Sequence, residues 1–330
     1  MGIKPAMVNT HMSVFGARST IRKSAKSSLI AIASPADNFY LCHKKTPMVI
    51  PSRMTTKETI MKKLSLSSIP ETMLIPLWAK ATETKRGDGM LHDEYSIKIL
   101  KAIDYDFRKF SHSKMSQVGC CIRASLIDGE VRSFLSRHPD AVVIQLGAGL
   151  DARYQRLGMP PVTHWYDLDL KEALDIRRRF LPESERNTYI EQSMFDDGWI
   201  QLVKSHHKPV LIIIEGVLMY FRPETVKKFF IHLCEAFDKG TILMDVLAFA
   251  AVRHAKYHDA VRNTEHKAEF LWSVLLSNEM ESWHPKLHLR QEYYMSDHDN
   301  KRFPWIARVL YKTPYFYRRF NQRIIRLEID

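Results

Sequence analysis

The sequence lacks a long uninterrupted hydrophobic run. No stretch approaches the roughly 18 consecutive apolar residues of a membrane-spanning helix, and the longest apolar segment, 209–220, is interrupted by Glu215 and has only the length of a strand. We therefore expect no transmembrane helix and no membrane partner.

Cysteine is also scarce. The four cysteines, Cys42, Cys120, Cys121 and Cys234, show neither the spacing of a metal site nor that of a disulfide framework. A reducing, cytoplasmic setting without a bound metal is the simplest expectation. Internal repeats and low-complexity blocks are absent as well.

Acidic residues are nearly absent from the first part of the chain. Residues 1–57 contain one acid, Asp37, against nine lysines and arginines, and they show no core-building pattern. We interpret 1–57 as a dispensable, basic and disordered leader, or as a start placed too early, ahead of Met54 or Met61. The formal net charge of +12 fits a merely basic surface better than a nucleic-acid partner.

From residue 58 onward the pattern is that of a folded domain. Helical spacing over 71–84, 92–110 and 118–138 predicts an α-helical prelude covering 58–138. Residues 139–330 then alternate between strands and helices. The predicted strands are 141–146, 164–169, 187–192, 209–214 and 240–249, followed by two closing strands at 287–294 and 324–329. This alternation predicts an α/β fold with a doubly wound, mostly parallel sheet of seven strands.

One long segment interrupts the alternation. Residues 252–283 show a mostly polar helical pattern, which predicts a helical lid over the carboxyl edge of the sheet. Its histidines, His254, His258 and His266, are candidate bases for an acceptor that must lose a proton. A carboxylate acceptor needs no such base.

A glycine turn after the first strand predicts a cofactor site. Gly147 and Gly149, with Ala152 and the later Asp169, fit a dinucleotide fingerprint. The same layout also suits S-adenosylmethionine, with an acid at the end of the second strand binding the ribose. Asp151, directly beyond the glycines, would repel a pyrophosphate, so it favours the cationic cofactor.

Several motifs together resemble a known family. They are Leu146-Gly-Ala-Gly-Leu-Asp-Ala-Arg153, Tyr166-Asp-Leu-Asp169, Glu215-Gly-Val-Leu-Met-Tyr-Phe221 and, upstream, Glu71-Thr-Met-Leu-Ile-Pro-Leu77. The chain resembles the S-adenosylmethionine-dependent methyltransferases that group leucine carboxyl methyltransferase with tetracenomycin-type polyketide O-methyltransferases. The resemblance covers about 65–250 and implies a Rossmann-like class I methyltransferase fold with S-adenosyl-L-methionine as cofactor.

The resemblance also implies roles for single residues. Gly147 and Gly149 would approach the aminocarboxylate part of the cofactor, and Asp169 would bind its ribose. Glu215 would face the methionine end. Arg123 would pair with a carboxylate of cofactor or substrate.

Further positions are implied less directly. Tyr220 would line the acceptor side, and with Arg123 it is the predicted catalytic residue. Ser193 and Met194 stand where some relatives have Asp-Leu beside the adenine, and Asp196 could substitute for that acid.

Each role has a structural alternative. Asp169 could cap the next helix, and Glu215 could be a buried acid paired with an arginine. Arg123 could lie on a solvated face, and Tyr220 could belong to the core.

The motifs thus predict an O-methyltransferase that methylates a carboxylate or a phenolic hydroxyl of a small molecule. Methylation of a protein C-terminus, a nicotinamide-dependent oxidoreductase and a nucleic-acid-binding or -modifying protein are the alternatives. The last rests on the basic, aromatic segment 301–326, which an amphipathic helix docked on the sheet explains better. Neither the acceptor nor the oligomeric state is predicted.

Overall fold

The computed structural model describes residues 71–264 and 268–330. The leader 1–57, the first residues of the prelude and the candidate base His266 lie outside the described residues.

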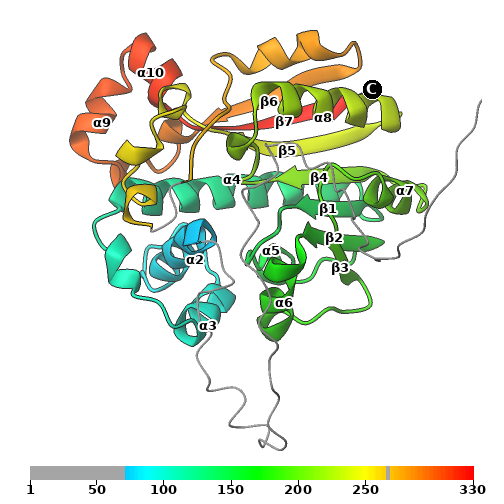
Figure 1. Cartoon of the computed structure of the whole chain (residues 1–330), viewed down its shortest axis with the longest axis horizontal. Coiled ribbons are helices and arrows are strands. Elements are labelled where there is room, and N and C mark those ends of the chain that lie inside the picture. The colour runs from blue at the N-terminus through cyan, green and yellow to red at the C-terminus, as the bar shows by residue number, and fades with distance from the viewer. Residues whose placement is uncertain (1–70, 265–267) are drawn as a thin grey trace, which may run out of the picture. The chain divides into compact units, whose positions relative to one another are not determined.

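A seven-stranded sheet organises the described residues (Figure 1). Its strands are β1 (Val142–Leu146), β2 (His164–Asp169), β3 (Asn187–Glu191), β4 (Val210–Ile214), β5 (Gly240–Val246), β6 (Leu287–Tyr294) and β7 (Arg323–Ile329). The strand order is β3-β2-β1-β4-β5-β7-β6, and β7 alone runs antiparallel to both of its neighbours. This arrangement confirms the predicted doubly wound, mostly parallel sheet.

The central strands β1 and β4 are buried along their whole length. They pair in parallel, with Val142 opposite Val210 and Leu146 opposite Ile214. Helices cover both faces of such a sheet, so its strands read as continuous apolar runs rather than alternating ones.

Helices and short 3-10 turns connect the strands. The helices are α2 (Glu71–Thr84), α3 (Glu94–Ala102), α4 (Lys114–Arg137), α5 (Arg153–Arg156), α6 (Lys171–Phe180), α7 (Gly198–Lys204), α8 (Pro223–Ala236), α9 (Trp305–Leu310) and α10 (Pro314–Phe320). The 3-10 turns are η3 (Phe107–Phe110), η4 (Leu218–Tyr220), η5 (Phe249–Ala251), η6 (Ala255–Tyr257), η7 (Val261–Asn263), η8 (Ser277–Trp283), η9 (Met295–Asp297) and η10 (Asn300–Arg302).

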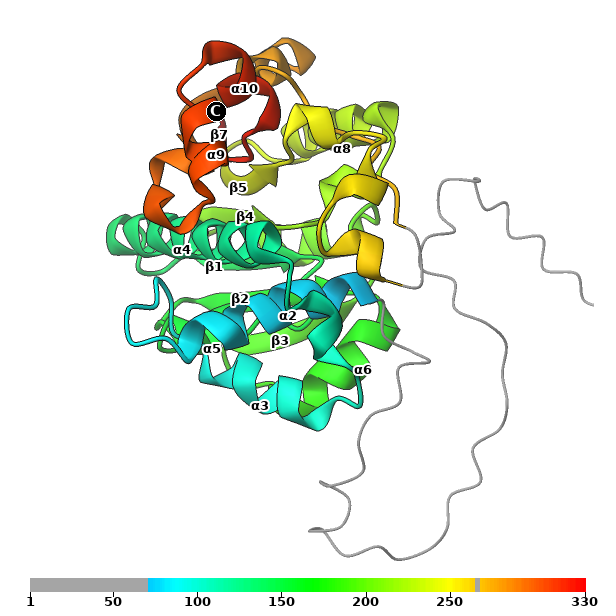
Figure 2. The same ribbon diagram turned by 90° about the vertical axis from the view of Figure 1, so that its left-hand side faces the viewer.

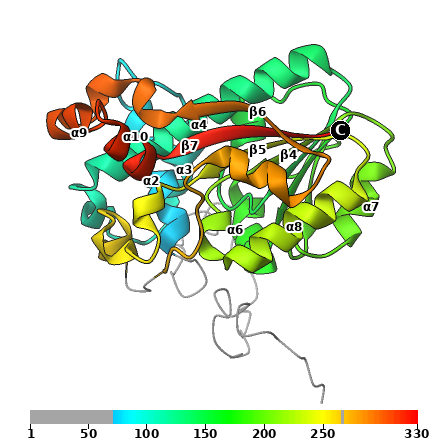
Figure 3. The same cartoon turned by 90° about the horizontal axis from the view of Figure 1, so that it is seen from above.

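Each face of the sheet has its own core. Val143 and Leu211 face α4, where Ile122 and Val131 are also buried. The alternate residues of the same strands pack against α7 and α8. Figure 3 shows α4 along one side of the strands and α8 along the other.

A third cluster joins the prelude to the lid segment. Leu74 and Leu77 of α2 and Ile99 of α3 pack in one cluster with Val261 and Phe270. Figure 2 shows the yellow segment that contains η5, η6 and η7 beside α2. The prelude and the segment after β5 therefore cover the carboxyl end of the sheet together.

Two expectations about helices are wrong, and one helix is additional to those expected. Residues 92–110 form α3 and η3 rather than one helix, because Ile103 is extended and Asp106 caps a new turn. The segment 252–283 holds 3-10 turns and extended chain, with no α-helix in 252–264 or 268–283. Helix α7, in turn, was not predicted.

The basic, aromatic segment 301–326 is also different from its prediction. It forms α9 and α10, separated at Thr313, which is extended before the proline that begins α10. Trp305 and Tyr315 are exposed, so these aromatic side chains are not docked on the sheet.

Among the described residues, none of the helices combines the length and the apolarity that crossing a membrane requires.

Candidate active site

A cavity of about 1280 Å³ lies at the carboxyl ends of the central strands. Its charged lining comes from α2, α4, the turn after β1 and the ends of β2 and β4, together with Arg253 and Asp259 of the lid segment and Arg319 of α10. Its apolar lining comes from the lid segment, η4, η5, α9 and α10, and includes Met219, Phe249, Phe270, Leu310, Phe316 and Phe320. The volume exceeds the roughly 300–1,000 Å³ of a typical ligand pocket. The cavity therefore has room for two small molecules side by side.

The glycine turn after β1 lines this cavity. Gly147 and Gly149 have φ values of +68° and +51°, which only glycine adopts without strain. A Cβ on Gly147 would also collide with the side chain of Val217. The positive φ angle and the packing of Val217 both require glycine at position 147.

Asp169 ends β2 and faces the glycine turn. Its Oδ2 accepts from the backbone N–H of Gly149 at 2.7 Å, and its Oδ1 accepts from that of Leu170 at 2.7 Å. Burial raises the pKa of the Asp169 carboxyl above its usual value, although these two hydrogen bonds oppose the shift. Asp169 also lines the cavity, so it can accept further hydrogen bonds there.

Arg123 and Glu215 form a buried pair at the end of β4. The Nε of Arg123 donates to Oε1 of Glu215 at 2.9 Å, and its Nη1 donates to Oδ2 of Asp245 at 3.1 Å. Burial alone would raise the pKa of the Glu215 carboxyl, but the charges of Arg153 and Arg123 outweigh it and lower that pKa. Arg123 is buried, so it does not lie on a solvated face.

The pairing anticipated as an alternative for Glu215 is present, because Arg153 also contacts its Oε2. Both Arg123 and Glu215 nevertheless line the cavity. Arg123 and Glu215 are therefore paired with each other and also accessible to a ligand in the cavity.

A second set of charges surrounds Asp151. Its carboxylate contacts Lys80 of α2, and its Oδ1 accepts from Nη1 of Arg156 at 2.9 Å. Arg156 also donates to Oδ2 of Asp93 at 2.9 Å. The network therefore ties the prelude to the glycine turn, which fixes the wall of the cavity at this end.

Gln145 is a buried cavity residue that the motifs did not indicate. Its Nε2 donates to Oδ2 of Asp151 at 3.1 Å. Within the described part of the chain, its Oε1 has no hydrogen-bond partner, and the residue lines the cavity. A buried acceptor of this kind is satisfied by a ligand or by water.

Tyr220 lines the cavity at η4. Its ring centroid lies 5.9 Å from that of Phe270, and its hydroxyl is hydrogen-bonded to the Thr72 side chain. Burial raises the pKa of Tyr220 to about 12. The phenol therefore stays protonated near neutral pH and is not a base.

Two of the candidate bases also line the cavity, His254 and His258. His254 is tied to its own segment, with Nδ1 2.8 Å from the Val252 carbonyl oxygen. His258 stands beside Ser116, 3.5 Å from its hydroxyl, and close to Asp259. Burial lowers the pKa of His258, although Asp259 opposes the shift, so its imidazole is neutral near pH 7.

The residues expected beside an adenine lie elsewhere. Ser193, Met194 and Asp196 follow β3, and none of them is among the cavity-lining residues that the structure describes. The backbone N–H of Ser193 donates to Asp196 Oδ2 at 3.1 Å, and Met194 is buried in the core. Their proposed role stays a prediction that this geometry does not support.

Comparison with known proteins finds similar methyltransferases. Residues 73–233 match the family model described as leucine carboxyl methyltransferase. The chain is 29% identical over 234 residues to the tetracenomycin polyketide synthesis O-methyltransferase TcmP of Streptomyces glaucescens, covering 71% of this chain and 86% of that protein. These matches support an S-adenosylmethionine-dependent methyltransferase similar to the leucine carboxyl methyltransferase type.

A second relative of this methyltransferase comes from Gibberella zeae. It is the S-adenosyl-L-methionine-dependent methyltransferase dpfgK, 26% identical over 275 residues, covering 76% of this chain and 91% of that protein. The alternative prediction of a nicotinamide-dependent oxidoreductase, which rested on the glycine turn, is therefore wrong. S-adenosylmethionine is the cofactor.

Solved structures of other methyltransferases are similar to this methyltransferase. One from Anabaena variabilis has a TM-score of 0.43 at 13% identity and covers 61% of this chain and 84% of its own. The magnesium protoporphyrin IX methyltransferase of Synechocystis, with bound cofactor, has a TM-score of 0.38 at 12% identity, covering 72% of this chain and 98% of its own.

The charged end of the cavity fits this cofactor. Its lining holds the cations Lys80 and Arg123 and the anions Asp151, Asp169 and Glu215, and Arg253, Arg319 and Asp259 line the cavity as well. The carboxylates suit a sulfonium and an ammonium, and Arg123 suits a carboxylate. The unpartnered Gln145 oxygen is an acceptor for an ammonium group. Neither Lys80 nor Gln145 belongs to a sequence motif, so the sequence alone does not indicate that they line the cavity. Only the structure shows that both lie beside the turn after β1.

Proposed function

We propose that this methyltransferase transfers a methyl group to an oxygen of a small, largely apolar molecule, either a carboxylate or a phenolic hydroxyl. The observation that carries the proposal is the apolar lining of the same cavity that holds the charged cluster around Arg123 and Glu215. The name of the Streptomyces relative, a polyketide O-methyltransferase, supports an oxygen acceptor.

Within this proposal the charged residues hold the cofactor. Arg123 would bind its carboxylate, Gln145 and Glu215 its ammonium, and Asp169 its ribose hydroxyls. S-adenosylmethionine supplies an electrophilic methyl group on a sulfonium. The protein's contribution is then to align the acceptor oxygen with that methyl and to exclude water.

The apolar residues would orient the acceptor. Met219, Tyr220 and Phe270 come from η4 and the lid segment, and all three line the cavity. Tyr220, protonated at neutral pH, would donate a hydrogen bond to the acceptor. Such a donor orients an acceptor without removing its proton.

A phenolic acceptor would need a base, and His258 is the residue we assign to that role. It lines the cavity, and its lowered pKa leaves the imidazole neutral at physiological pH. For a carboxylate acceptor, His258 would be dispensable. The effect of His258→Gln therefore separates the two acceptor classes.

A methyl-transfer assay tests the proposal. We would incubate the full chain with cofactor labelled in its methyl group and with hydroxylated aromatic acids, their phenol-capped and acid-capped analogues, and a peptide with a free C-terminus. Mild alkali releases methanol from a methyl ester and leaves a methyl ether intact, so the treatment assigns the acceptor oxygen. Asp169→Ala should abolish transfer, whereas Leu202→Ser, on the exposed face of α7, should not.

The expected result is alkali-labile or alkali-stable label on the small aromatic molecule. Binding of the cofactor without transfer to any of these oxygen acceptors would overturn the proposal. Transfer to the peptide alone would replace the small acceptor with a protein C-terminus.

A further inference from the structure

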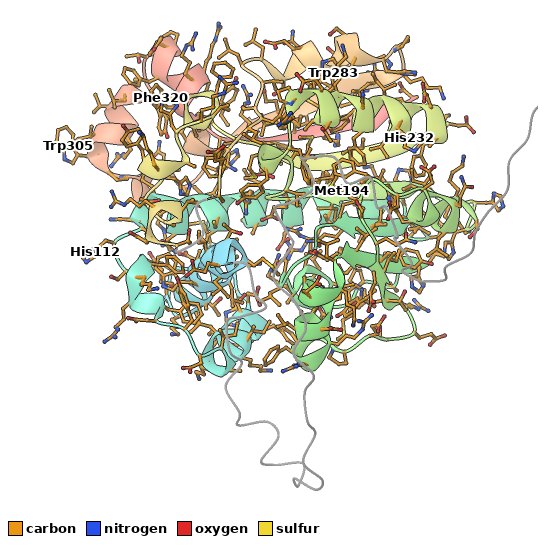
Figure 4. The ribbon with its side chains drawn as sticks, in the orientation of Figure 1. His112, Met194, His232, Trp283, Trp305 and Phe320 are labelled. Atoms are coloured by element: carbon orange, nitrogen blue, oxygen red, sulfur yellow. The ribbon has the colours of Figure 1, made fainter. Side chains whose placement is uncertain are left out.

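Helices α9 and α10 carry an unusual number of exposed apolar side chains. We call this surface the α9–α10 face and define it by Trp305, Ile306, Val309, Leu310, Tyr315 and Phe320. Trp305 is 70% exposed and Tyr315 is 61% exposed. Figure 4 shows Trp305 at the outer edge of the molecule. Contiguous exposed apolar surface of this kind marks an interaction site.

The apolar residues of α9 are exposed around much of this short helix. Trp305 and Val309 are four residues apart and lie on one side, and Ile306 and Leu310 lie about 100° further round. Arg308, three residues after Trp305, is exposed beside it. Every residue of α9 except Ala307 is exposed, so the helix presents its apolar side chains to solvent.

The same segment is strongly basic. Residues 301–327 contain eight lysines and arginines and no aspartate or glutamate. Arg323 and Arg326 are drawn inward to Glu292 and Glu130. The exposed basic side chains are Lys301, Arg308, Lys312 and Arg318.

Acids do occur just before the segment. Asp297 and Asp299 are exposed, and Asp297 accepts a hydrogen bond from the hydroxyl of Tyr317 at 2.6 Å. Neither belongs to α9 or α10. The α9–α10 face thus combines aromatic, aliphatic and cationic groups.

The cavity opens beside this face. Leu310 and Phe320 line the cavity and are also 37% and 45% exposed, so they stand at its mouth. Tyr257 of the lid segment also lines the cavity and is 69% exposed. Whatever covers the α9–α10 face therefore also lies against the entrance of the cavity.

We propose that the α9–α10 face docks on an anionic lipid surface. Tryptophan and tyrosine side chains with leucine-like neighbours seat at the boundary between headgroups and acyl chains, while lysine and arginine attract anionic headgroups. This peripheral docking departs from the sequence-based expectation of no membrane partner, which considered spanning segments only. If the proposed function holds, an apolar acceptor passes directly between lipid and cavity.

Other occupants fit the face less well. A second copy of the chain would place exposed arginines and lysines against one another, and like charges facing each other in an interface cost several kcal/mol. Nucleic acid would satisfy the charges and stack on aromatic rings, but it offers nothing to Ile306, Val309 and Leu310. The exposed aliphatic side chains of Ile306, Val309 and Leu310 therefore favour lipid.

Vesicle binding by the full chain tests the docking. We would compare sedimentation with phosphatidylcholine vesicles and with vesicles that also contain phosphatidylserine. The double variant Arg308→Glu/Lys312→Glu should bind the anionic vesicles more weakly, by roughly fivefold for each basic side chain lost and more for its reversal. The matched control is Lys227→Glu/Lys228→Glu, which makes the same charge change on the exposed side of α8.

A second measurement reports insertion of the apolar groups. Brominated lipid should quench part of the tryptophan emission of the wild type, and the Trp305→Phe variant should lose that part. Because Phe keeps the ring, this variant should still bind the vesicles. Both measurements are independent of methyl transfer, so their failure is distinguishable from failure of the proposed function.

Several results would overturn the proposal. They are equal weakening of vesicle binding by the two double variants, quenching that is unchanged in Trp305→Phe, and absence of binding to the anionic vesicles. RNA binding that only Arg308→Glu/Lys312→Glu removes, without vesicle binding, would make the face a nucleic-acid surface. A dimer in sedimentation velocity that Trp305→Ala dissociates would make it a contact between copies.

Discussion

Asp259, in the lid segment, caps the first turn of α4 through Ser116. The backbone N–H of Ser116 donates to Oδ2 of Asp259 at 3.2 Å, that of Met115 donates to the same oxygen at 3.0 Å, and the Ser116 hydroxyl contacts Oδ1. Ser113, the N-cap residue, makes no side-chain cap and donates instead to the Asp259 carbonyl at 2.8 Å. A negative charge at a helix N-terminus is favourable, so the lid is fastened to the helix that carries Arg123.

Loss of this cap should loosen the lid. In Asp259→Ala we expect a loss of about 1 kcal/mol in the free energy of unfolding, faster tryptic cleavage after Arg253 and Arg262, and a higher KM for the acceptor. Limited proteolysis and steady-state kinetics measure these effects. Asp175→Ala, which removes an exposed carboxylate from α6, is the control. Cleavage at the wild-type rate in Asp259→Ala would contradict the fastening.

Substitution of Asp169 and substitution of Asp196 should have different effects on cofactor binding. Asp169 lines the cavity and Asp196 does not. Asp169→Asn should weaken binding of S-adenosylmethionine by roughly 10- to 100-fold, as loss of hydrogen bonds to a charged acceptor predicts, whereas Asp196→Asn should leave it unchanged. Calorimetric titration measures both, with thermal unfolding to confirm that each variant is folded. Equal weakening by the two would return the adenine role to Asp196.

Asp151 should make the protein sensitive to acid. Burial alone would raise the pKa of its carboxyl, but Arg156 and Lys80 hold it well below the usual 3.8. The stabilisation is therefore complete above the unfolded-state pKa and is lost as the pH falls toward the lower pKa of the folded state. At about pH 7, Asp151→Asn should cost about 3–5 kcal/mol, because it removes the carboxylate that pairs with the buried Lys80, whereas Arg156 keeps Asp93 and Asp128.

The pH dependence of the free energy of unfolding distinguishes loss of the Asp151 charge from a simple packing defect. Urea unfolding at about pH 7 and about pH 3 should show a smaller acid-induced loss in Asp151→Asn than in the wild type. An identical loss in both proteins would show that this carboxylate does not govern acid stability.

Tyr220 should act without titrating. Its pKa of about 12 keeps the hydroxyl protonated at the pH of the reaction. Tyr220→Phe should raise the KM for the acceptor, by up to about tenfold for a neutral hydrogen bond, and should leave the pH profile of kcat/KM unchanged between about pH 6 and 9. A profile that loses a limb in Tyr220→Phe would mean that the phenol does exchange a proton. Thr72→Val, which removes the hydroxyl's partner, is the matched test of its orientation.

Much of the fold follows from short-range patterns. The apolar run of β4, the acid at the end of β2 and the glycines at 147 and 149 determine a parallel sheet with a cofactor turn, because strand burial and positive φ angles leave their mark on neighbouring residues. Short-range patterns also explain why the prediction of a helix over 252–283 is wrong. Its apolar residues have helical spacing, but their packing against α2 and α3 holds them in 3-10 turns and extended chain.

The sequence by itself determined the sheet, the cofactor class and the stretch in which each motif residue stands. Only the tertiary structure decided that Arg123 and Glu215, 92 residues apart, form a pair, that Gln145 and Lys80 belong to the cavity, and that Ser193 and Met194 do not. It also decided that Trp305 of α9 and Tyr315 of α10 face outward. The reason is that such contacts join side chains distant in sequence, and no local periodicity encodes which of them meet.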